Sequence, residues 1–309
     1  MNEGINVLSL FDGISCGQIA LQRAGIKVNK YYASEIDKHA IKITQHNWPN
    51  TIQLGSVVDI KAVDLPKIDL LMGGSPCTNF SFAGKRNGMS TVDKQEILTL
   101  GHYLDLKSKG YEFEGQSYLF WEYIRILKEV KPKYFLLENV KMPGKWKDLI
   151  SDVLEVEPIE INSALVSAQN RHRLYWTSIP NVSKPNDKKI LLKDILDYNV
   201  ENYRFYTEDQ MKKWNEKKYI RKDYYRIESL DGKVQCLMAQ CGSNAPRILV
   251  NKKLRYLTRM EWERLQTVPD GYTNLVSEHQ AKHALGNGWT VDVIAHIFSF
   301  LLDEFKKNG

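Results

Sequence analysis

Short apolar runs that end in glycine or polar residues constrain the fold of this chain more than any other feature. Four of them cover residues 6–11, 30–34, 68–72 and 134–137. Runs of this length predict buried strands, and helical spacing between some of them predicts helices. Strands that alternate with helices favour an open α/β sheet, whose ligands bind at the carboxyl ends of the strands.

Helices are expected where apolar residues recur at helical spacing, at residues 37–47, 117–130, 257–265 and 291–302. A weaker pattern gives a possible helix at residues 94–104. Thr258 is a favourable N-cap residue, and Glu261 completes a capping box three residues later.

One cysteine lies just beyond the third of these strands. Gly73 and Gly74 predict a tight turn there, and Cys77 follows it. A structural cysteine more often packs inside an apolar run, so the position of Cys77 favours a ligand site, although a cysteine taken alone is more often inert than catalytic. Glu138 directly follows the strand at residues 134–137. Both side chains leave the carboxyl ends of strands, and we expect them to converge at one edge of the sheet.

The first strand, turn and helix have the features of a nucleoside site. Asp12 and Gly13 lie in the turn, where glycine lets the backbone approach a ligand. Glu35 ends the next strand about 20 residues later, the usual position of a carboxylate that holds ribose hydroxyls. Asp59 is expected at the end of another strand, within residues 55–60. It could accept from an adenine amino group or cap a helix.

Two later segments carry residues suited to binding. Residues 78–116 form a long, basic, glycine-punctuated segment of the kind that serves as a lid or binding loop. Strands are expected at residues 165–167 and 174–178, with Arg171 and Arg173 between them. Two residues apart on extended backbone, these arginines should face the same side. They could clamp a carbonyl or phosphate, or pair with surface carboxylates.

Charge is concentrated in one part of the chain. Residues 181–254 hold sixteen Lys and Arg against ten Asp and Glu, which accounts for the whole net charge of +6. A lysine-rich solvated face is one explanation. The other is a phosphate-binding surface, which the interleaved tyrosines of this segment favour. A boundary near Pro180 is expected, because the periodicity weakens there.

Composition excludes several classes of protein. The N-terminus lacks the pattern of a secretory signal, and no apolar stretch is long enough to cross a bilayer, so we expect a cytoplasmic protein. Four cysteines in such a chain do not suggest disulfides. Cys236 and Cys241 lack the partners of a zinc site, and we predict no metal.

Nine motifs, in the same order and at similar spacing, resemble those of the cytosine-C5 DNA methyltransferases. They are Phe11-Asp12-Gly13, Glu35, Asp59, Gly74-Ser75-Pro76-Cys77, Leu119-Phe120, Glu138-Asn139-Val140, Gln169-x-Arg171-x-Arg173, Arg259-x-x-x-x-Arg264-Leu265-Gln266 and Gly286-Asn287-Gly288. The first motif resembles that of the animal de novo enzymes, whereas the compact length is similar to that of bacterial or phage enzymes. Forty-two positions separate Cys77 from Leu119, which is longer than expected of the family.

The resemblance implies a Rossmann-like domain that binds S-adenosylmethionine, with a smaller target-recognition domain. The catalytic and cofactor-binding domain would cover residues 1–180, the target-recognition region 181–254, and a C-terminal return to the catalytic domain 255–309. The cofactor residues implied by the motifs are Phe11, Asp12, Gly13, Glu35, Ile36, Asp59, Ile60, Leu119 and Asn287.

The same resemblance implies the chemistry. Cys77 would add to C6 of cytosine and activate C5 toward the methyl group, Glu138 would assist at N3, and Arg173 would bind O2 with Arg171 supporting the loop. The target base must leave the DNA duplex to react. Beyond Cys77, the candidates for phosphate contact are Ser81, Lys85 and Arg86, which could equally be solvated loop residues.

Double-stranded DNA is the expected partner, and a cognate restriction endonuclease is a further possible partner. The protein itself is expected to be a nucleoid-associated monomer.

Two alternative functions stay open. A tRNA cytosine-C5 methyltransferase would share the fold, but that branch resembles Pro-Pro-Cys where this chain has Ser75-Pro76-Cys77. A non-catalytic nucleic-acid-binding paralogue would be expected to lack Cys77, Glu138 or the arginine pair.

Overall fold

The computed structural model describes residues 4–76, 89–198, 200, 205–217, 227–239, 245–251 and 253–307, with backbone alone at 214, 215 and 217. The chain forms two compact units. One comprises Met1–Ile161, His172–Lys184 and Ala295–Gly309, and the other comprises Asn162–Arg171 and Pro185–Ile294.

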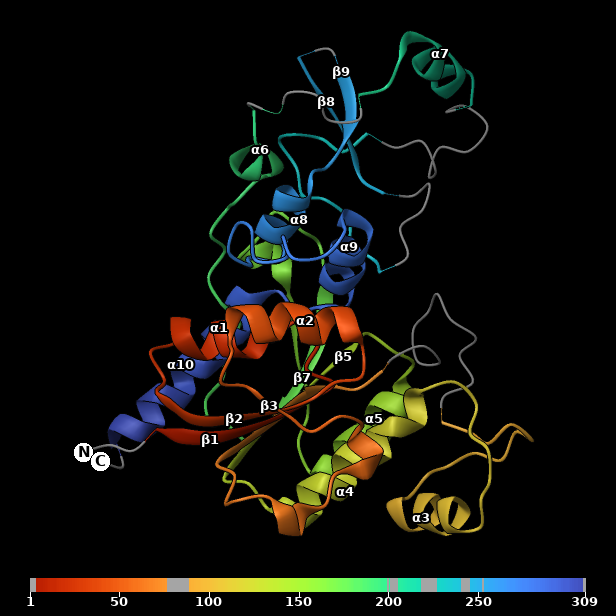
Figure 1. Ribbon diagram of the computed structural model, residues 1–309, viewed down its shortest axis with the longest axis vertical. Coiled ribbons are helices and arrows are strands. Elements are labelled where there is room, and N and C mark those ends of the chain that lie inside the picture. Colours follow the sequence, from red (N-terminus) through yellow and green to blue (C-terminus); the bar gives the residue numbers. More distant parts are fainter. Residues whose placement is uncertain are drawn as a thin grey trace. The chain divides into compact units, whose positions relative to one another are not determined.

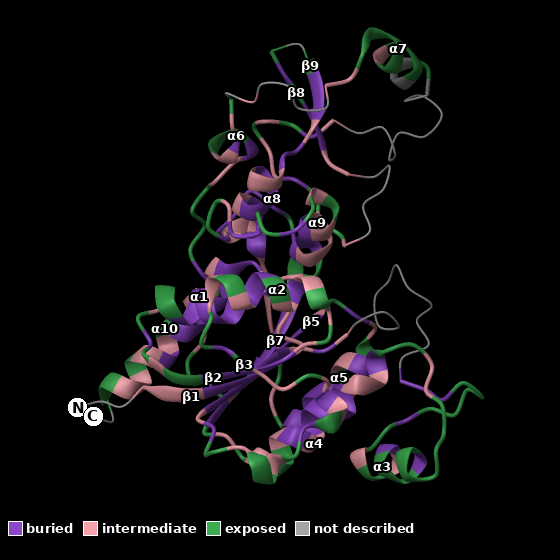
Figure 2. Cartoon of the chain, viewed as in Figure 1, coloured by how far each residue is buried: buried purple, intermediate pink, exposed green. Residues whose placement is uncertain are grey.

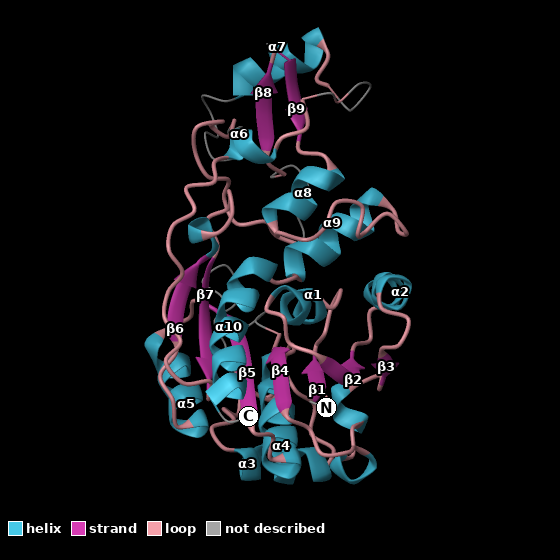
Figure 3. Cartoon of the chain, turned by 90° about the vertical axis from the view of Figure 1, so that its left-hand side faces the viewer, coloured by secondary structure: helices cyan, strands magenta, loops and turns pink. Residues whose placement is uncertain are grey.

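The first unit is built on a sheet of seven strands among the described residues, in the order β3-β2-β1-β4-β5-β7-β6 (Figure 3). These strands are β1 (Ile5–Leu10), β2 (Val28–Ser34), β3 (Ile52–Gln53), β4 (Leu70–Gly74), β5 (Tyr134–Val140), β6 (Ile159–Asn162) and β7 (His172–Thr177). Strands β1 to β5 pair in parallel, whereas β7 runs antiparallel to β5. The predicted α/β fold with an open, mostly parallel sheet is confirmed.

Helices cover both faces of this sheet (Figure 1). One face carries α1 (Cys16–Arg23), α2 (Lys38–Asn47) and the part of α10 (Val291–Lys307) that belongs to this unit; α4 (Phe120–Val130) and α5 (Gly144–Leu154) lie on the other. Next to α4 lies α3 (Leu100–Ser108). Short 3-10 helices, η1 (Val57–Asp59), η2 (Ala62–Asp64) and η3 (Ser117–Leu119), complete the unit.

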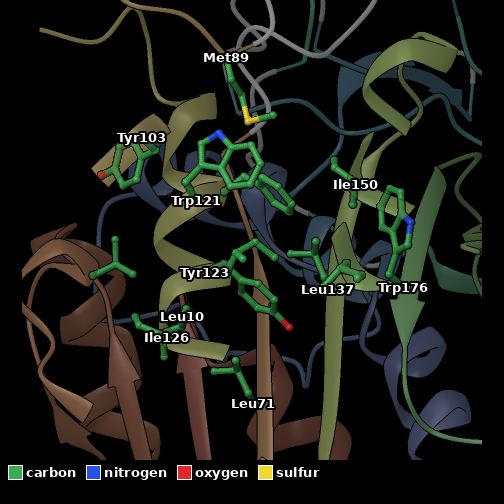
Figure 4. Close-up of a cluster of buried hydrophobic side chains, with 14 of the residues drawn as sticks. Leu10, Leu71, Met89, Tyr103, Trp121, Tyr123, Ile126, Leu137, Ile150 and Trp176 are labelled. Carbon is green, nitrogen blue, oxygen red and sulfur yellow. The ribbon is translucent and has the colours of Figure 1, made fainter. Parts of the chain in front are cut away.

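The core lies between the sheet and these helices. Val7 and Leu8 of β1 and Leu70 and Leu71 of β4 are all 0% exposed. Figure 2 shows that much of the sheet is buried. On one side, Leu71 and Leu137 of the sheet pack with Trp121 and Tyr123 of α4 (Figure 4). Gly73 is needed where β4 passes β1, because a Cβ atom there would lie 2.9 Å from the carbonyl oxygen of Leu10.

Most expected elements are confirmed, and local capping explains where they begin. Asp37 starts α2 by accepting from the backbone amides of His39 (2.7 Å) and Ala40 (3.1 Å). The expected helix at residues 117–130 is η3 followed by α4. The possible helix at 94–104 begins later, at Leu100, because Thr99 caps it.

Two expected strands are wrong. Residues 55–60 contain η1, and the strand of this region is the earlier β3. Of residues 165–167, Leu165 ends the 3-10 helix η4 (Ser163–Leu165) and the other two follow it. This helix comes directly after β6 and begins where the Asn162 side chain accepts from the amide of Ala164 (3.0 Å). At Asn162 a polar side chain turns the chain, and in both places the apolar run is too short to distinguish a strand from a turn.

The second unit holds α6 (Leu192–Ile195), α7 (Glu208–Lys217), α8 (Arg259–Leu265), α9 (Glu278–Asn287) and the antiparallel pair β8 (Arg247–Val250) and β9 (Lys253–Tyr256). The capping box of Thr258 and Glu261 at α8 is confirmed. Gln169 ties its segment to this unit, since its side chain accepts from the Leu237 amide (2.8 Å) and donates to the Leu265 carbonyl oxygen (3.2 Å).

The division of the chain differs from the expected one at its C-terminal end. The return to the first unit was expected at residue 255, and in the structure it begins at Ala295. Residues 255–294 group with the second unit because α8 packs with α6 and α9 there.

No single helix among the described residues is long and apolar enough to cross a membrane. Only α9 and α10 taken together, with a bend of 42° between them, have the length and composition.

Candidate active site

The carboxyl ends of β4 and β5 lie side by side, and Gly74 is paired in register with Glu138. Beyond them, the Asn139 side chain donates to the hydroxyl (3.0 Å) and the carbonyl oxygen (3.2 Å) of Ser75. Ser75 and Asn139 are both buried, which strengthens hydrogen bonds of this kind. The chain leading to Cys77 is therefore fixed beside Glu138 as far as Ser75. Cys77 itself lies outside the described residues, as do Ser81, Lys85 and Arg86.

Glu138 is held by an arginine from the neighbouring strand. Arg173 lies on β7, opposite Val140 of β5, and its Nε is 3.0 Å from Oε1 of Glu138. One Nη of the same guanidinium donates to the His172 carbonyl oxygen (2.8 Å). Both side chains are largely buried, at 14% and 10% exposed, so the pair is poorly screened by water. The structure thus brings together two of the predicted catalytic residues.

Arg171 takes different partners, all in the second unit. Its guanidinium donates to the carbonyl oxygens of Leu237 (3.0 Å), Gly286 (3.1 Å) and Gly288 (2.8 Å). The residue is 3% exposed and precedes β7, so the alternation expected of a strand does not apply to it. These contacts fix the backbone on both sides of Asn287.

The turn after β1 has an unusual backbone. Phe11, Gly13 and Ser15 all have positive φ, at 56°, 58° and 57°. Such conformations cost energy in residues other than glycine and cluster at functional sites. Glu35, at the end of β2, accepts from the amides of Gly13, Ile36 and Asp37 at 2.7 to 2.8 Å. The predicted nucleoside residues of the first two strands therefore meet at one point.

Asp12 anchors this turn. Its carboxylate accepts from the Tyr31 hydroxyl (2.7 Å) and, through a short hydrogen bond, from the Ser15 hydroxyl. Burial raises the pKa of Asp12 to about 6, and the negative charge of Glu35 adds to the increase, although the bonds from Ser15 and Tyr31 oppose it. Thr44 of α2 joins the network by donating to the hydroxyl of Ser15 (3.1 Å).

The remaining predicted cofactor residues differ in exposure. Ile36 is 71% exposed, which is unusual for a large apolar side chain. Asp59 is exposed on η1, whereas Ile60 is buried in the core and Leu119 packs at its border. Asn287 ends α9 in the second unit.

The donor set suits a nucleoside bearing ribose hydroxyls. In Glu35, Oε1 accepts two amides and Oε2 one, so Oε2 keeps a lone pair for a hydroxyl donor. Ile36, the next residue, is exposed and offers an apolar surface, and Asp59, exposed on η1, offers a hydrogen-bond acceptor. Among the described residues there is no group of three or more His, Cys, Asp and Glu that could hold a metal ion.

The profile of one protein family, the C-5 cytosine-specific DNA methylases, matches residues 5–100, 107–148 and 187–302. The chain belongs to this family. It is therefore a DNA (cytosine-5-)-methyltransferase, and the resemblance found in its motifs is confirmed.

Two curated relatives resemble this methylase over nearly its whole length. It is 30% identical to the type II methyltransferase M1.ScrFI of Lactococcus lactis subsp. cremoris, over 98% of its own chain and 79% of the relative. It is 26% identical to the type II methyltransferase M.Bsp6I of Bacillus sp. (strain RFL6), over 95% and 97%. The structure of the Entamoeba histolytica methyltransferase EhMeth shares the fold, with a TM-score of 0.71, 18% identity and coverage of 98% and 99%.

Sequence reasoning missed three residues that build this methylase site. Asn139 was noted only as part of a motif, although its position after Glu138 could have indicated a partner on the next strand. Tyr31 sits in an apolar-looking strand, where its hydroxyl gave no signal. Arg125 of α4, whose contacts are described below, had a visible signal in its spacing of three residues from Glu122.

Proposed function

We propose that this methylase transfers a methyl group from S-adenosylmethionine to C5 of a cytosine flipped out of duplex DNA, through a covalent bond between Cys77 and C6. The observation that carries the proposal is the pair of hydrogen bonds from Asn139 to Ser75, next to the register of Gly74 with Glu138. These bonds hold Ser75, which lies two residues before Cys77, next to the part of β5 that carries Glu138.

The residue types suit this reaction. Cytosine C5 is a poor nucleophile, and addition of a thiolate at C6 raises its electron density. Glu138 assists at N3 as the ring accepts electrons, and Arg173 holds the Glu138 carboxylate from one side while it binds the base at O2. When bound, S-adenosylmethionine supplies an electrophilic methyl group. Removal of the C5 proton and elimination of Cys77 then release the product.

The cofactor would lie against the turn after β1. Glu35 would accept from a ribose hydroxyl, Ile36 would pack against the adenine ring, and Asp59 would accept from the adenine amino group. Phe11, Asp12 and Gly13 would shape the turn, while Ile60, Leu119 and Asn287 complete the implied set. The spare lone pair of Glu35 Oε2 and the exposure of Ile36 support this assignment.

The target sequence would be read by residues 181–254, the basic, tyrosine-rich segment. Ser81, Lys85 and Arg86 would contact phosphates as the loop closes over the flipped base. We further infer a nucleoid-associated monomer. The type II names of two relatives support a cognate restriction endonuclease as its partner.

The test supplies S-adenosylmethionine with a labelled methyl group, and either mixed-sequence duplex DNA or tRNA, to the wild type and to Cys77→Ser. We expect label in DNA with the wild type and none with the variant, although both bind the cofactor. Label in tRNA alone would overturn the DNA assignment. Label in DNA that survives Cys77→Ser would overturn the covalent mechanism.

A further inference from the structure

The turn that presents Asp59 has little internal support. Its helix, η1, has three residues, and one backbone hydrogen bond within it runs from the Asp59 amide to the Ser56 carbonyl oxygen (3.1 Å). The Ser56 side chain makes no capping bond. Val57 and Ile60 on either side are buried, while Asp59 is exposed. A segment this short holds one geometry only if contacts from elsewhere fix it.

Those contacts come from one guanidinium on α4. Arg125 donates from Nη2 to the Val57 carbonyl oxygen and from Nη1 to the Ile60 carbonyl oxygen, both at 3.1 Å. The two acceptors bracket Asp59 in the sequence. Because the guanidinium is planar and rigid, it fixes both ends of the turn at once, which a lysine ammonium cannot do with the same geometry.

A buried carboxylate orients this guanidinium. Glu122 is 0% exposed and accepts from Nε of Arg125 at 2.6 Å, through Oε2. Its other oxygen, Oε1, accepts from the Tyr103 hydroxyl and the Lys107 ammonium, each at 2.6 Å. Tyr103 and Lys107 belong to α3, within the long segment that separates Cys77 from Leu119. Figure 4 shows Tyr103 beside α4, next to Trp121.

Charge favours this arrangement as a unit. Two cations and a hydroxyl converge on one carboxylate that water does not reach, and charge-assisted bonds are strong in such surroundings. Burial lowers the pKa of Arg125, but the bond to Glu122 and its charge raise it overall. Burial and the bond to Glu122 likewise raise the pKa of Tyr103. Arg125 therefore keeps its positive charge, and Tyr103 keeps its proton, across the physiological range.

We propose that Glu122 and Arg125 are positioning residues that couple the α3 segment to the turn presenting Asp59, and thereby set the affinity for the cofactor. The inference rests on the proposed role of Asp59. It adds a route by which the segment following the nucleophile acts on the cofactor site: a shift of α3 changes the bonds to Glu122, which reorients Arg125 and its two carbonyl partners.

The first experiment measures the dissociation constant of S-adenosylmethionine without DNA, by equilibrium dialysis, together with kcat at saturating cofactor. We expect about tenfold weaker binding for Arg125→Gln and a smaller loss for Arg125→Lys, with kcat unchanged within about twofold. The controls are Glu129→Gln, which removes only the exposed partner of the same guanidinium, and Lys128→Gln on the exposed side of α4. Equal binding by folded Arg125→Gln and wild type would overturn the proposal.

The second experiment does not depend on the cofactor. Hydrogen exchange of the Asp59 and Ile60 amides is compared in the wild type, Arg125→Lys and Tyr103→Phe, which loses only a hydroxyl. Faster exchange in both variants supports coupling through Glu122, and unchanged exchange in Tyr103→Phe would overturn the link to α3. If the wild type bound no S-adenosylmethionine while exchange still changed, the proposed function would fail but the coupling would stand.

Discussion

The side-chain amide of Asn139 holds Ser75 by both its hydroxyl and its carbonyl oxygen, and so joins two motifs that lie 64 residues apart. Replacement by alanine removes both donors from a buried site. We expect Asn139→Ala to lower kcat by about 10²-fold, the scale of a misplaced reacting group, with little change in cofactor affinity. Single-turnover methylation of DNA measures the first quantity, and dialysis measures the second.

A matched variant at Ser75 tests the same hydrogen bonds at their acceptor. Ser75→Ala removes the hydroxyl acceptor but keeps the carbonyl, so its effect should be smaller than that of Asn139→Ala. If the two variants were equally slow, the backbone contact would contribute nothing to positioning.

Glu138 is predicted to act on the base rather than on the cofactor. Glu138→Gln keeps the size of the side chain but removes its proton-accepting charge and weakens its pairing with Arg173. Loss of general acid–base assistance predicts a fall in kcat of about 10²- to 10⁴-fold at unchanged cofactor affinity. Arg173→Lys, which keeps the charge but loses the Nε contact, is expected to be less impaired. Equal rates for Glu138→Gln and the wild type would exclude the assigned role.

Asp12 predicts a specific pH dependence of stability. Its pKa is about 6 in the folded protein, above the ordinary value of 3.8, so the folded state holds this proton more tightly. Its contribution to the free energy of unfolding is fully present below pH 3.8 and is lost as the pH rises through 6. Asp12→Asn should remove that loss, on the order of 3 kcal/mol, since each unit of pKa shift corresponds to about 1.4 kcal/mol.

Urea unfolding of the wild type and Asp12→Asn between pH 4 and about 7 tests this dependence. Asp64→Asn, at an exposed carboxylate, serves as the control and should follow the wild type. Parallel curves for Asp12→Asn and the wild type would contradict the predicted linkage.

Gly286 is required by packing in the second unit. A Cβ atom there would lie 2.4 Å from the Ala239 amide nitrogen and 2.5 Å from the Met238 carbonyl carbon, and backbone cannot move aside cheaply. We expect Gly286→Ala to lower the free energy of unfolding by about 1–3 kcal/mol, the usual cost of overpacking. Gly101→Ala, where nothing lies within 4 Å, should instead stabilise α3 by about 0.5–1 kcal/mol.

Features set by short-range chemistry could be predicted from the sequence. Asp37 and Thr258 start their helices as capping rules predict, and β2 ends at Ser34, just before Glu35, where its apolar run stops. Strand β5, by contrast, continues past Glu138 to Val140. That the carboxyl ends of β4 and β5 lie together could also be predicted, because parallel strands end at the same edge of a sheet. These features depend on neighbours within a few residues or on general rules of sheet topology.

Features set by distant partners could not be predicted. Glu122 is a charged residue within the helix α4, and nothing near it in the sequence shows that it is 0% exposed and bonded to Tyr103 and Lys107 of α3. Arg171 and Arg173 looked alike in the sequence, yet one donates to carbonyl oxygens of the second unit and the other pairs with Glu138. The polarity of a side chain shows which kinds of hydrogen bond it can make, but not which distant element will provide the partner.

The second unit is assembled from two separate stretches, Asn162–Arg171 and Pro185–Ile294. Suppose that a single continuous block from residue 185 onward were swapped between relatives to exchange specificity. Gln169 and Arg171 would then come from one parent, and the backbone groups that they bond would come from the other. A hybrid enzyme that keeps those bonds must carry the ten-residue stretch along with the larger block, so two separate blocks must be exchanged where the linear sequence suggests one.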